Sequence, residues 1–380
     1  MLKNKFTILD IGSSKINLAS VSKTNAEDYI IDSFAEGQYS GFYNGKFNSI
    51  EELNTALINC FNILAKYQKH INTLYVSVPS EFCFCTIKNV EQSFDKLTKI
   101  KENNIVDLHK MIALEDQFKN HKLINISPIY YELDDEQIVE NPIGKKSVVF
   151  NSCISYVFAE NYFINTITSV LNQMGIYNIQ FTSTALAQAL FLLDEKTRQN
   201  SSVVIDCGST TTSVALINNN SLLTLNAFSL GGKYILSDIK ECFNISYEEA
   251  NALLKQIDLT MKDFIGKNYV VNDRTYSCKI TNNIVLSRVE QIINAINACF
   301  KAHDESYFSG VKIFLTGGGL TYLNGAVEYL AGLLKKPVYI VKSEADELSK
   351  PEQSSYYGLI DYALNNDGFE NNIIQKIYEI

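Results

Sequence analysis

Residues 8–16 read ILDIGSSKI, and residues 203–216 read VVIDCGSTTTSVAL. In both stretches an apolar run ends in Asp-x-Gly, passes through hydroxyl side chains and returns as a second run. The alternation and the β-branched residues predict a strand, a tight polar turn and a second strand in each place. Because this design recurs about half a chain apart, we expect two related α/β lobes, each of which opens with a hairpin.

The turn residues have the chemistry of a phosphate-binding site. Gly12 lets the backbone turn sharply and approach a ligand, and nearby N–H groups and hydroxyls can donate to phosphate oxygens. Asp10 and Asp206 cannot face a phosphate directly, but each can hold a hydrated Mg²⁺ and position water, which makes them the candidate catalytic and metal residues. For one copy alone, an ordinary polar hairpin is the alternative. The candidate nucleotide-binding residues of the two turns are Gly12, Ser13, Ser14, Lys15, Gly208, Ser209, Thr210 and Thr211.

Two glycine runs follow the second hairpin. Gly317, Gly318 and Gly319 stand between an expected strand, VKIFLT, and an expected helix near 321–334. A backbone without side chains there would let a flat ring or a ribose approach, and a helix N-terminus favours negative charge. Gly231 and Gly232 form a similar turn after the strand expected at 222–230. For either glycine run alone, the alternative is an ordinary tight connection between two elements.

Composition narrows the class of protein. The chain has 380 residues, a net charge of −9 and no basic stripe, so nucleic acid is not an expected partner. No apolar run approaches the ~18 residues of a spanning helix, and the first ten residues lack a signal-type apolar segment. We therefore expect a cytosolic chain with reduced cysteines, in which Cys83 and Cys85 belong to a buried strand.

The order hairpin, hairpin, Gly-Gly, Gly-Gly-Gly resembles the phosphate and adenosine motifs of the actin/heat-shock-70/sugar-kinase superfamily. Within it, the chain resembles the bacterial cell-division family FtsA. The resemblance lies in ILDIGSSKI, in ISPIYYELDDEQIVENPIG at 126–144, and in the segments 230–255 and 313–340. It implies an α/β, two-lobed actin-like ATPase fold with an inserted small α+β subdomain.

The resemblance also implies ATP and Mg²⁺ as ligands, with at most slow hydrolysis. In the family the second motif usually ends in an acid, where this chain has Ser213. Asn251 stands where we would align a glutamate, and Lys255 is a candidate contact on the purine side. The protein would then be a nucleotide-dependent scaffold more than an efficient enzyme.

The expected domain organisation follows the same resemblance. The chain divides into a first lobe at 1–81, an inserted α+β subdomain at 82–159, a return to the first lobe at 160–200, a second-lobe core at 201–227 and 305–345, an outer subdomain at 228–304, a second return to the first lobe at 346–364, and a linker with a terminal helix at 365–380.

The implied partners are those of FtsA. The outer subdomain would bind the C-terminal tail of FtsZ, with Arg288 as a candidate partner for an acidic tail. A solvated helix arginine is the alternative. The inserted subdomain would mediate self-assembly into filaments and contact later division proteins. The implied location is the division site, on the cytoplasmic face of the bacterial inner membrane.

The C-terminus is the weakest part of the resemblance. The apolar residues of LNNDGFENNIIQKIYEI fall within one helical stripe, which suits an amphipathic anchor on a membrane surface. Lys376 stands against Glu370 and Glu379, so anionic lipid would add little. A helix that packs back on the protein is the alternative. The candidate membrane residues are Phe369, Ile373, Ile374, Ile377 and Ile380.

Two other functions stay open. One is another actin-like scaffold, such as the pilus-assembly protein PilM, which shares the inserted-module layout. The other is a small-molecule kinase of the same superfamily, which would need a carboxylate base on its substrate side. The sequence offers no carboxylate with a distinctive context for that role.

Overall fold

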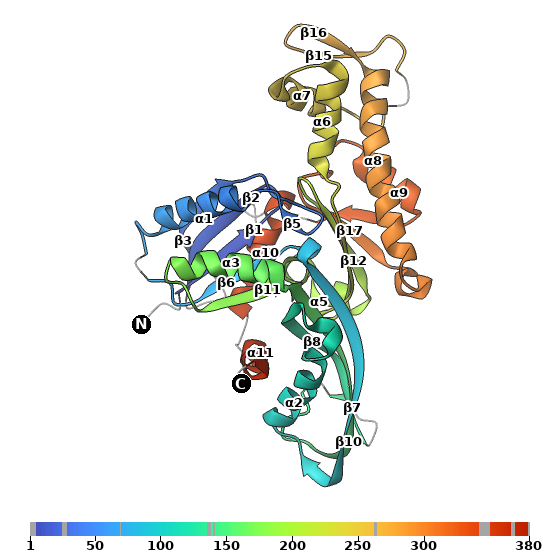
Figure 1. The fold of residues 1–380 in the computed structure, drawn as a ribbon. Coiled ribbons are helices and arrows are strands. Elements are labelled where there is room, and N and C mark those ends of the chain that lie inside the picture. The colour runs from blue at the N-terminus through green and yellow to red at the C-terminus, as the bar shows by residue number, and fades with distance from the viewer. Residues whose placement is uncertain are drawn as a thin grey trace.

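The computed structural model describes residues 5–24, 29–68, 70–134, 138–139, 141–261, 264–341, 350–365 and 369–378. Two five-stranded sheets organise it (Figure 1). The first has the order β11-β6-β1-β2-β3, and the second has the order β14-β13-β12-β17-β18. Their strands are β1 (Lys5–Ile11), β2 (Lys15–Lys23), β3 (Tyr29–Gln38), β6 (Leu74–Val78), β11 (Ile179–Ser183), β12 (Ser202–Cys207), β13 (Thr212–Asn218), β14 (Ser221–Phe228), β17 (Lys312–Thr316) and β18 (Val338–Ile340).

The two sheets share one topology. In each, three antiparallel strands come first (β1-β2-β3 and β12-β13-β14), and two parallel strands then extend the sheet beside the first strand (β6 and β11, β17 and β18). The strand-turn-strand structure predicted at both Asp-x-Gly motifs is therefore confirmed. The expected two-lobed α/β fold is confirmed.

Helices cover the first sheet and follow the expected periodicity. In α1 (Ile50–Leu64) the apolar residues Leu53, Leu57, Phe61 and Leu64 are all buried, as their spacing predicts. Ser49 caps this helix by accepting from the Glu52 amide. The remaining helices of this lobe are α3 (Asn161–Gln173), α4 (Thr184–Leu192), α5 (Glu195–Gln199) and α10 (Ser354–Asn365). A short hairpin, β4 (Phe42–Tyr43) and β5 (Lys46–Phe47), precedes α1.

The inserted subdomain projects away from both lobes (Figure 1). Its antiparallel sheet has the order β7-β10-β8-β9, and it has a separate apolar core that includes Ile105, Phe150 and Ile154. Its helix ends at Ala113, and a 3-10 turn at Asp116–Phe118 follows. Its elements are β7 (Cys83–Lys99), α2 (Glu102–Ala113), β8 (His121–Leu133), β9 (Ile138–Val139) and β10 (Lys146–Glu160).

The outer subdomain projects from the second lobe on the opposite side (Figure 1). Its long helix begins at Cys278, and a two-stranded hairpin precedes it. Its elements are α6 (Gly232–Phe243), α7 (Tyr247–Leu254), β15 (Asn268–Val271), β16 (Arg274–Ser277) and α8 (Cys278–Lys301), and α9 (Ala326–Leu334) packs on the second-lobe core.

The C-terminal helix α11 (Phe369–Tyr378) lies against the inserted subdomain (Figure 1). Ile373 and Ile377 are buried in that subdomain's core, with Ile374 packed beside them. The expectation of a free membrane anchor is therefore corrected: the apolar face is already covered, as in the alternative of a helix packed on the protein. The Phe369 side chain and Ile380 lie outside the described residues. Within the described residues, no helix has both the length and the apolar character to cross a membrane.

Candidate functional site

A cavity of about 390 Å³ lies between the two lobes. Its wall combines the turns of both hairpins, the loop before α9 and the start of α10. The sequence-predicted residues that line it are Asp10, Gly12, Ser13, Ser14, Lys15, Asp206, Gly208, Ser209, Thr211, Gly232, Gly317, Gly318 and Gly319. Residues about 300 positions apart in the sequence thus meet in one cavity.

The two turns have the same internal geometry. The Gly12 amide donates to the Lys15 carbonyl at 2.8 Å, and the Gly208 amide donates to the Thr211 carbonyl at 2.9 Å. The turns also contact each other through Ser13 and Thr210. Together they present hydroxyls and backbone N–H groups to the cavity from both sides, which suits an anionic ligand.

Asp10 is held by three side chains. Its carboxylate accepts from Asn17 on β2, from Ser77 on β6 and from Ser355 on α10, at 3.2, 2.9 and 2.9 Å. The residue is only 1% exposed, and burial raises its carboxyl pKa above the ordinary value despite these hydrogen bonds. The carboxylate therefore has a fixed orientation at the cavity wall.

Asp206 is held from α4. The Gln188 amide donates to its Oδ2 at 2.8 Å and also contacts the Ser354 hydroxyl at 3.0 Å. Burial raises the Asp206 pKa to about 6, and the negative charge of Asp10 adds to the shift. Because Ser354 and Ser355 are neighbours on α10, the start of this helix joins the hydrogen-bond networks of both acids.

This donor set fits a hydrated cation. Two neighbouring carboxylates, one buried and one partly buried, are stabilised by a divalent ion, and Mg²⁺ needs only one or two carboxylates together with waters. Within the described residues there is no group of three or more His, Cys, Asp or Glu side chains that could hold a metal directly. The geometry therefore suits a metal that arrives with a phosphate ligand.

The glycine runs pack closely around the second turn. A Cβ at Gly317 would lie 2.2 Å from the Asp206 carboxylate, and Gly317 has a φ of +81°. A Cβ at Gly231 would lie 2.5 Å from the Ser209 carbonyl, and one at Gly319 would lie 2.6 Å from the Cys207 sulfur. These glycines thus allow backbone to pack against backbone, while Gly318 keeps an ordinary φ and lines the cavity.

Three predicted nucleotide residues do not line the cavity. Thr210 and Gly231 lie behind it, since Thr210 contacts Ser13 and Gly231 packs on the second turn. Lys255 is exposed, because α7 ends at Leu254 and the next residue turns toward solvent. Asn251 and Leu254 line the cavity in its place.

Arg288 also differs from the expectation. It lies in the middle of α8, and its guanidinium makes a two-point ion pair with Asp238 on α6, at 2.7 and 2.8 Å. It also lies over the Tyr234 ring, and the Asp238 carboxylate raises the pKa of the arginine. Arg288 is therefore a structural tie between two helices, and its charge is already neutralised.

Sequence reasoning missed several residues of the site. Gln188, Ser77 and Ser355 orient the two acids, and Glu81 and Lys233 line the cavity. These residues can be identified only by their position in space near the acids and the cavity. A local signal existed for Lys233 alone, since it follows the Gly-Gly pair directly.

By sequence, the chain is similar to cell-division proteins. The family described as "Cell division protein FtsA" matches residues 203–358. FtsA of Escherichia coli K12 is 21% identical over 341 residues, which cover 86% of this chain and 79% of that protein. FtsA of Neisseria meningitidis serogroup B is 22% identical over 398 residues, covering 97% and 94%.

Solved structures share the fold at low sequence identity. A PilM-PilN type IV pilus biogenesis complex has a TM-score of 0.64 at 14% identity and covers 95% of this chain and 98% of its own. MreB5 of Spiroplasma citri bound to AMPPNP has a TM-score of 0.54 at 12% identity, with 98% of both chains covered. The chain thus has an actin-like fold and is similar to the cell-division protein FtsA over most of its length.

Proposed function

We propose that this protein binds MgATP between the Asp10 and Asp206 hairpins and serves as a filament-forming cell-division adaptor for FtsZ. The observation that carries the nucleotide part is the pair of equivalent turns that face one cavity. The division role rests on the similarity to FtsA. The proposed location is the division site on the inner face of the cytoplasmic membrane, reached through division partners and not through α11.

In this proposal the turns bind the phosphates with their N–H groups and hydroxyls. Asp10 and Asp206 hold Mg²⁺ through water, and the metal neutralises phosphate charge. The base and ribose lie near Gly318, with Asn251 and Leu254 beside them. Turnover is expected to be well below the ~10 per second of a typical enzyme.

Calorimetry with MgATP tests the binding site, and Gly318→Asp is the variant of choice. Gly318 has an ordinary φ, and a Cβ there would meet only the Glu352 side chain, at 3.1 Å. An aspartate should therefore fit once Glu352 shifts by a few tenths of an ångström, and its side chain and charge should block the ligand. Gly332→Asp is the matched control, since a Cβ at Gly332 meets nothing within 4 Å. Unchanged binding to Gly318→Asp would remove the ligand from this loop.

The FtsZ tail is proposed to bind the outer subdomain at 228–304. Because Asp238 already holds Arg288, the tail is expected to bind without needing this arginine. Co-sedimentation of FtsZ with the intact protein tests the partnership. Arg288→Met and Asp238→Asn should weaken the pairing of α6 with α8 to a similar extent, and neither should abolish FtsZ binding selectively.

Self-assembly is proposed to use the inserted subdomain. Leu97 and Ile138 are large apolar side chains that are 60% and 70% exposed there. Leu97→Glu with Ile138→Glu should prevent filaments seen by electron microscopy with MgATP, while ATP binding survives. Tyr177→Glu on the first lobe is the control, at 74% exposure. Normal filaments from the double variant would point to another surface.

A pilus-assembly scaffold is the second candidate, because the PilM-PilN complex shares the fold over nearly the whole chain. Purification of the tagged protein from its own cells separates the two roles. Recovery of FtsZ supports the division adaptor, and recovery of pilus-assembly proteins without FtsZ supports the alternative.

A further inference from the structure

A second cavity, of about 220 Å³, lies where three parts of the chain meet. The inserted subdomain contributes β8, the first lobe contributes its edge strand β11, and the C-terminal helix α11 closes the third side. It shares no residue with the cavity between the lobes. Its lining residues are Lys122, Leu123, Ile124, Ile179, Gln180, Phe181, Ile374, Gln375 and Tyr378.

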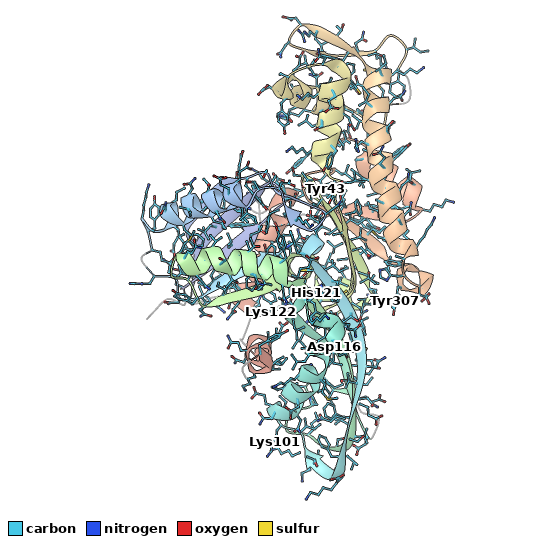
Figure 2. The ribbon with its side chains drawn as sticks, in the orientation of Figure 1. Tyr43, Lys101, Asp116, His121, Lys122 and Tyr307 are labelled. Carbon is cyan, nitrogen blue, oxygen red and sulfur yellow. The ribbon has the colours of Figure 1, made fainter. Side chains whose placement is uncertain are left out.

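The charge in this cavity is Lys122, which Figure 2 shows where the subdomain meets the first lobe. Its ammonium lies over the Tyr378 ring, 5.8 Å from the centroid. Burial lowers the Lys122 pKa. Among the described residues its ammonium has no ion pair, whereas Lys88 and Lys376 of the same region pair with Glu115 and Glu102.

Apolar side chains form about half of the remaining wall and are firmly held. Ile124 and Phe181 are 2% and 9% exposed, and Ile374 packs with the subdomain core. The Tyr378 hydroxyl accepts from the Leu123 amide at 2.8 Å, which fixes the ring that the ammonium faces. The cavity therefore offers one cation at the edge of a hydrocarbon surface.

We propose that this cavity binds a carboxylate that is attached to a hydrocarbon group. The carboxylate pairs with the Lys122 ammonium, and the hydrocarbon lies against Phe181, Ile374 and Tyr378. An ammonium drawn out of water without a partner is costly, and a charge-assisted hydrogen bond to a carboxylate offsets that cost. Phosphate fits less well, because it carries no apolar group to lie against these side chains.

The size of the cavity limits the ligand. At roughly 30 Å³ per water, the space equals about seven waters, which suits a small acid or the last residue of a peptide. Both sources present the same chemistry, a carboxylate beside an apolar group. Because α11 forms one wall, a bound acid should also stabilise the docked helix.

Ligand-observed NMR of the intact protein tests the site with 3-phenylpropanoate and its neutral amide. The peptide Gly-Gly-Phe, with a free or an amidated C-terminus, distinguishes the chain-end source from the small acid. We expect the acids to bind and the amides to bind at least about tenfold more weakly. Equal binding of acid and amide, or no binding of any probe at about 5 mM, would overturn the proposal.

The variant Lys122→Met keeps the hydrocarbon stem and removes the charge. It should lose the acid's binding by about tenfold or more, while Lys119→Met, an exposed lysine before β8, should not. Without ligand, Lys122→Met should melt at a higher temperature than the native protein, because a half-buried charge without an ion pair is gone. The acid should raise the melting temperature of the native protein only.

A further experiment tests whether the chain itself supplies the carboxylate. Glu379→Gln removes the side-chain carboxylate that follows Tyr378 and keeps the length of the chain. If only this variant binds the acid, the native chain supplies the anion and the ligand site is refuted. Equal binding by both proteins supports an external acid.

Discussion

The Ser13 hydroxyl oxygen accepts from the backbone N–H of Thr210 at 3.2 Å, and the Thr210 hydroxyl donates to the Ser13 carbonyl at 3.3 Å. Both residues are buried, and they belong to different lobes. The two phosphate-type turns are therefore bonded to each other at the base of the cavity. A ligand that separates the lobes must replace these two bonds with its own.

Ser13→Ala removes the acceptor for the Thr210 amide. We expect the free energy of unfolding to fall by about 1–2 kcal/mol, because a buried N–H then lacks its partner. ATP should bind about tenfold more weakly if the hydroxyl also contacts phosphate. Calorimetry and thermal melting measure both effects. Ser237→Ala is the control, since its hydroxyl bonds only to the Lys233 carbonyl of the same helix. Equal stability of Ser13→Ala and native protein would contradict the bond.

The pH dependence of stability should report Asp206. Its pKa rises from 3.8 to about 6 on folding, so the folded chain holds the proton more tightly than the unfolded chain does. This group therefore favours folding most at low pH, and stability is lost as the pH rises from about 4 through about 6. The full loss is about 3 kcal/mol, at 1.36 kcal/mol per pKa unit.

Asp206→Asn should abolish this loss of stability with rising pH. We expect the variant to melt at a higher temperature than the native protein at pH 8 and to bind MgATP poorly. Asp194→Asn should behave in the opposite way, because hydrogen bonds to Thr197 lower the Asp194 pKa. Melting temperatures of the native protein and both variants, measured between pH 4 and pH 8, test this prediction. Parallel curves for native protein and Asp206→Asn would show that this carboxylate is not buried in its charged form.

A second contact joins the lobes at the mouth of the cavity. Ser229 follows β14, and its hydroxyl donates to the Glu81 carboxylate at 2.7 Å and accepts from the Asn44 amide at 2.9 Å. Figure 2 shows the neighbouring Tyr43 near the foot of α6. Burial raises the Glu81 pKa above its ordinary value. Ser229 thus ties the small β4–β5 hairpin to the loop that leads into α6.

Ser229→Ala should open this contact. We expect a fluorescent ATP analogue to dissociate about three- to tenfold faster in stopped-flow experiments, because closure of the lobes is weakened. Glu81→Gln combined with Ser229→Ala should add little to Ser229→Ala alone, since Ser229→Ala already removes the bond to Glu81. The Ser237→Ala control should release nucleotide at the native rate. Fully additive effects of the two substitutions would show that Ser229 and Glu81 act independently.

The features predicted correctly from sequence are local ones. Asp10 and Gly12 stand two residues apart, and hairpin, turn and phosphate-type chemistry are all visible in that short span. Gln188 and Ser355 could not be predicted, because the acids they orient lie 18 and 345 residues away. Arg288 illustrates the same limit. Its charge suggested an external partner, but Asp238, 50 residues earlier, already neutralises it.

The C-terminal helix illustrates the limit for an amphipathic pattern. The spacing of its isoleucines predicts an apolar face but cannot say what covers that face. In the structure Ile377 is fully buried against the inserted subdomain, and Lys376 pairs with Glu102 of α2 at 2.6 Å. The Glu370 carboxylate bonds both to the Ile126 amide and to the Tyr362 hydroxyl of α10. α11 therefore links the subdomain to the first lobe.

Ile377→Ala tests whether the helix stays docked in solution. Truncating a fully buried isoleucine leaves a cavity and should cost about 2–5 kcal/mol, which lowers the melting temperature by several degrees. Gln375→Ala on the exposed side of the same helix should change it little. Because α11 completes the core of the subdomain, Ile377→Ala should also speed proteolysis within residues 82–159. If Ile377→Ala melts and is cleaved like Gln375→Ala, the helix spends its time away from the subdomain, and its apolar face is free for another surface.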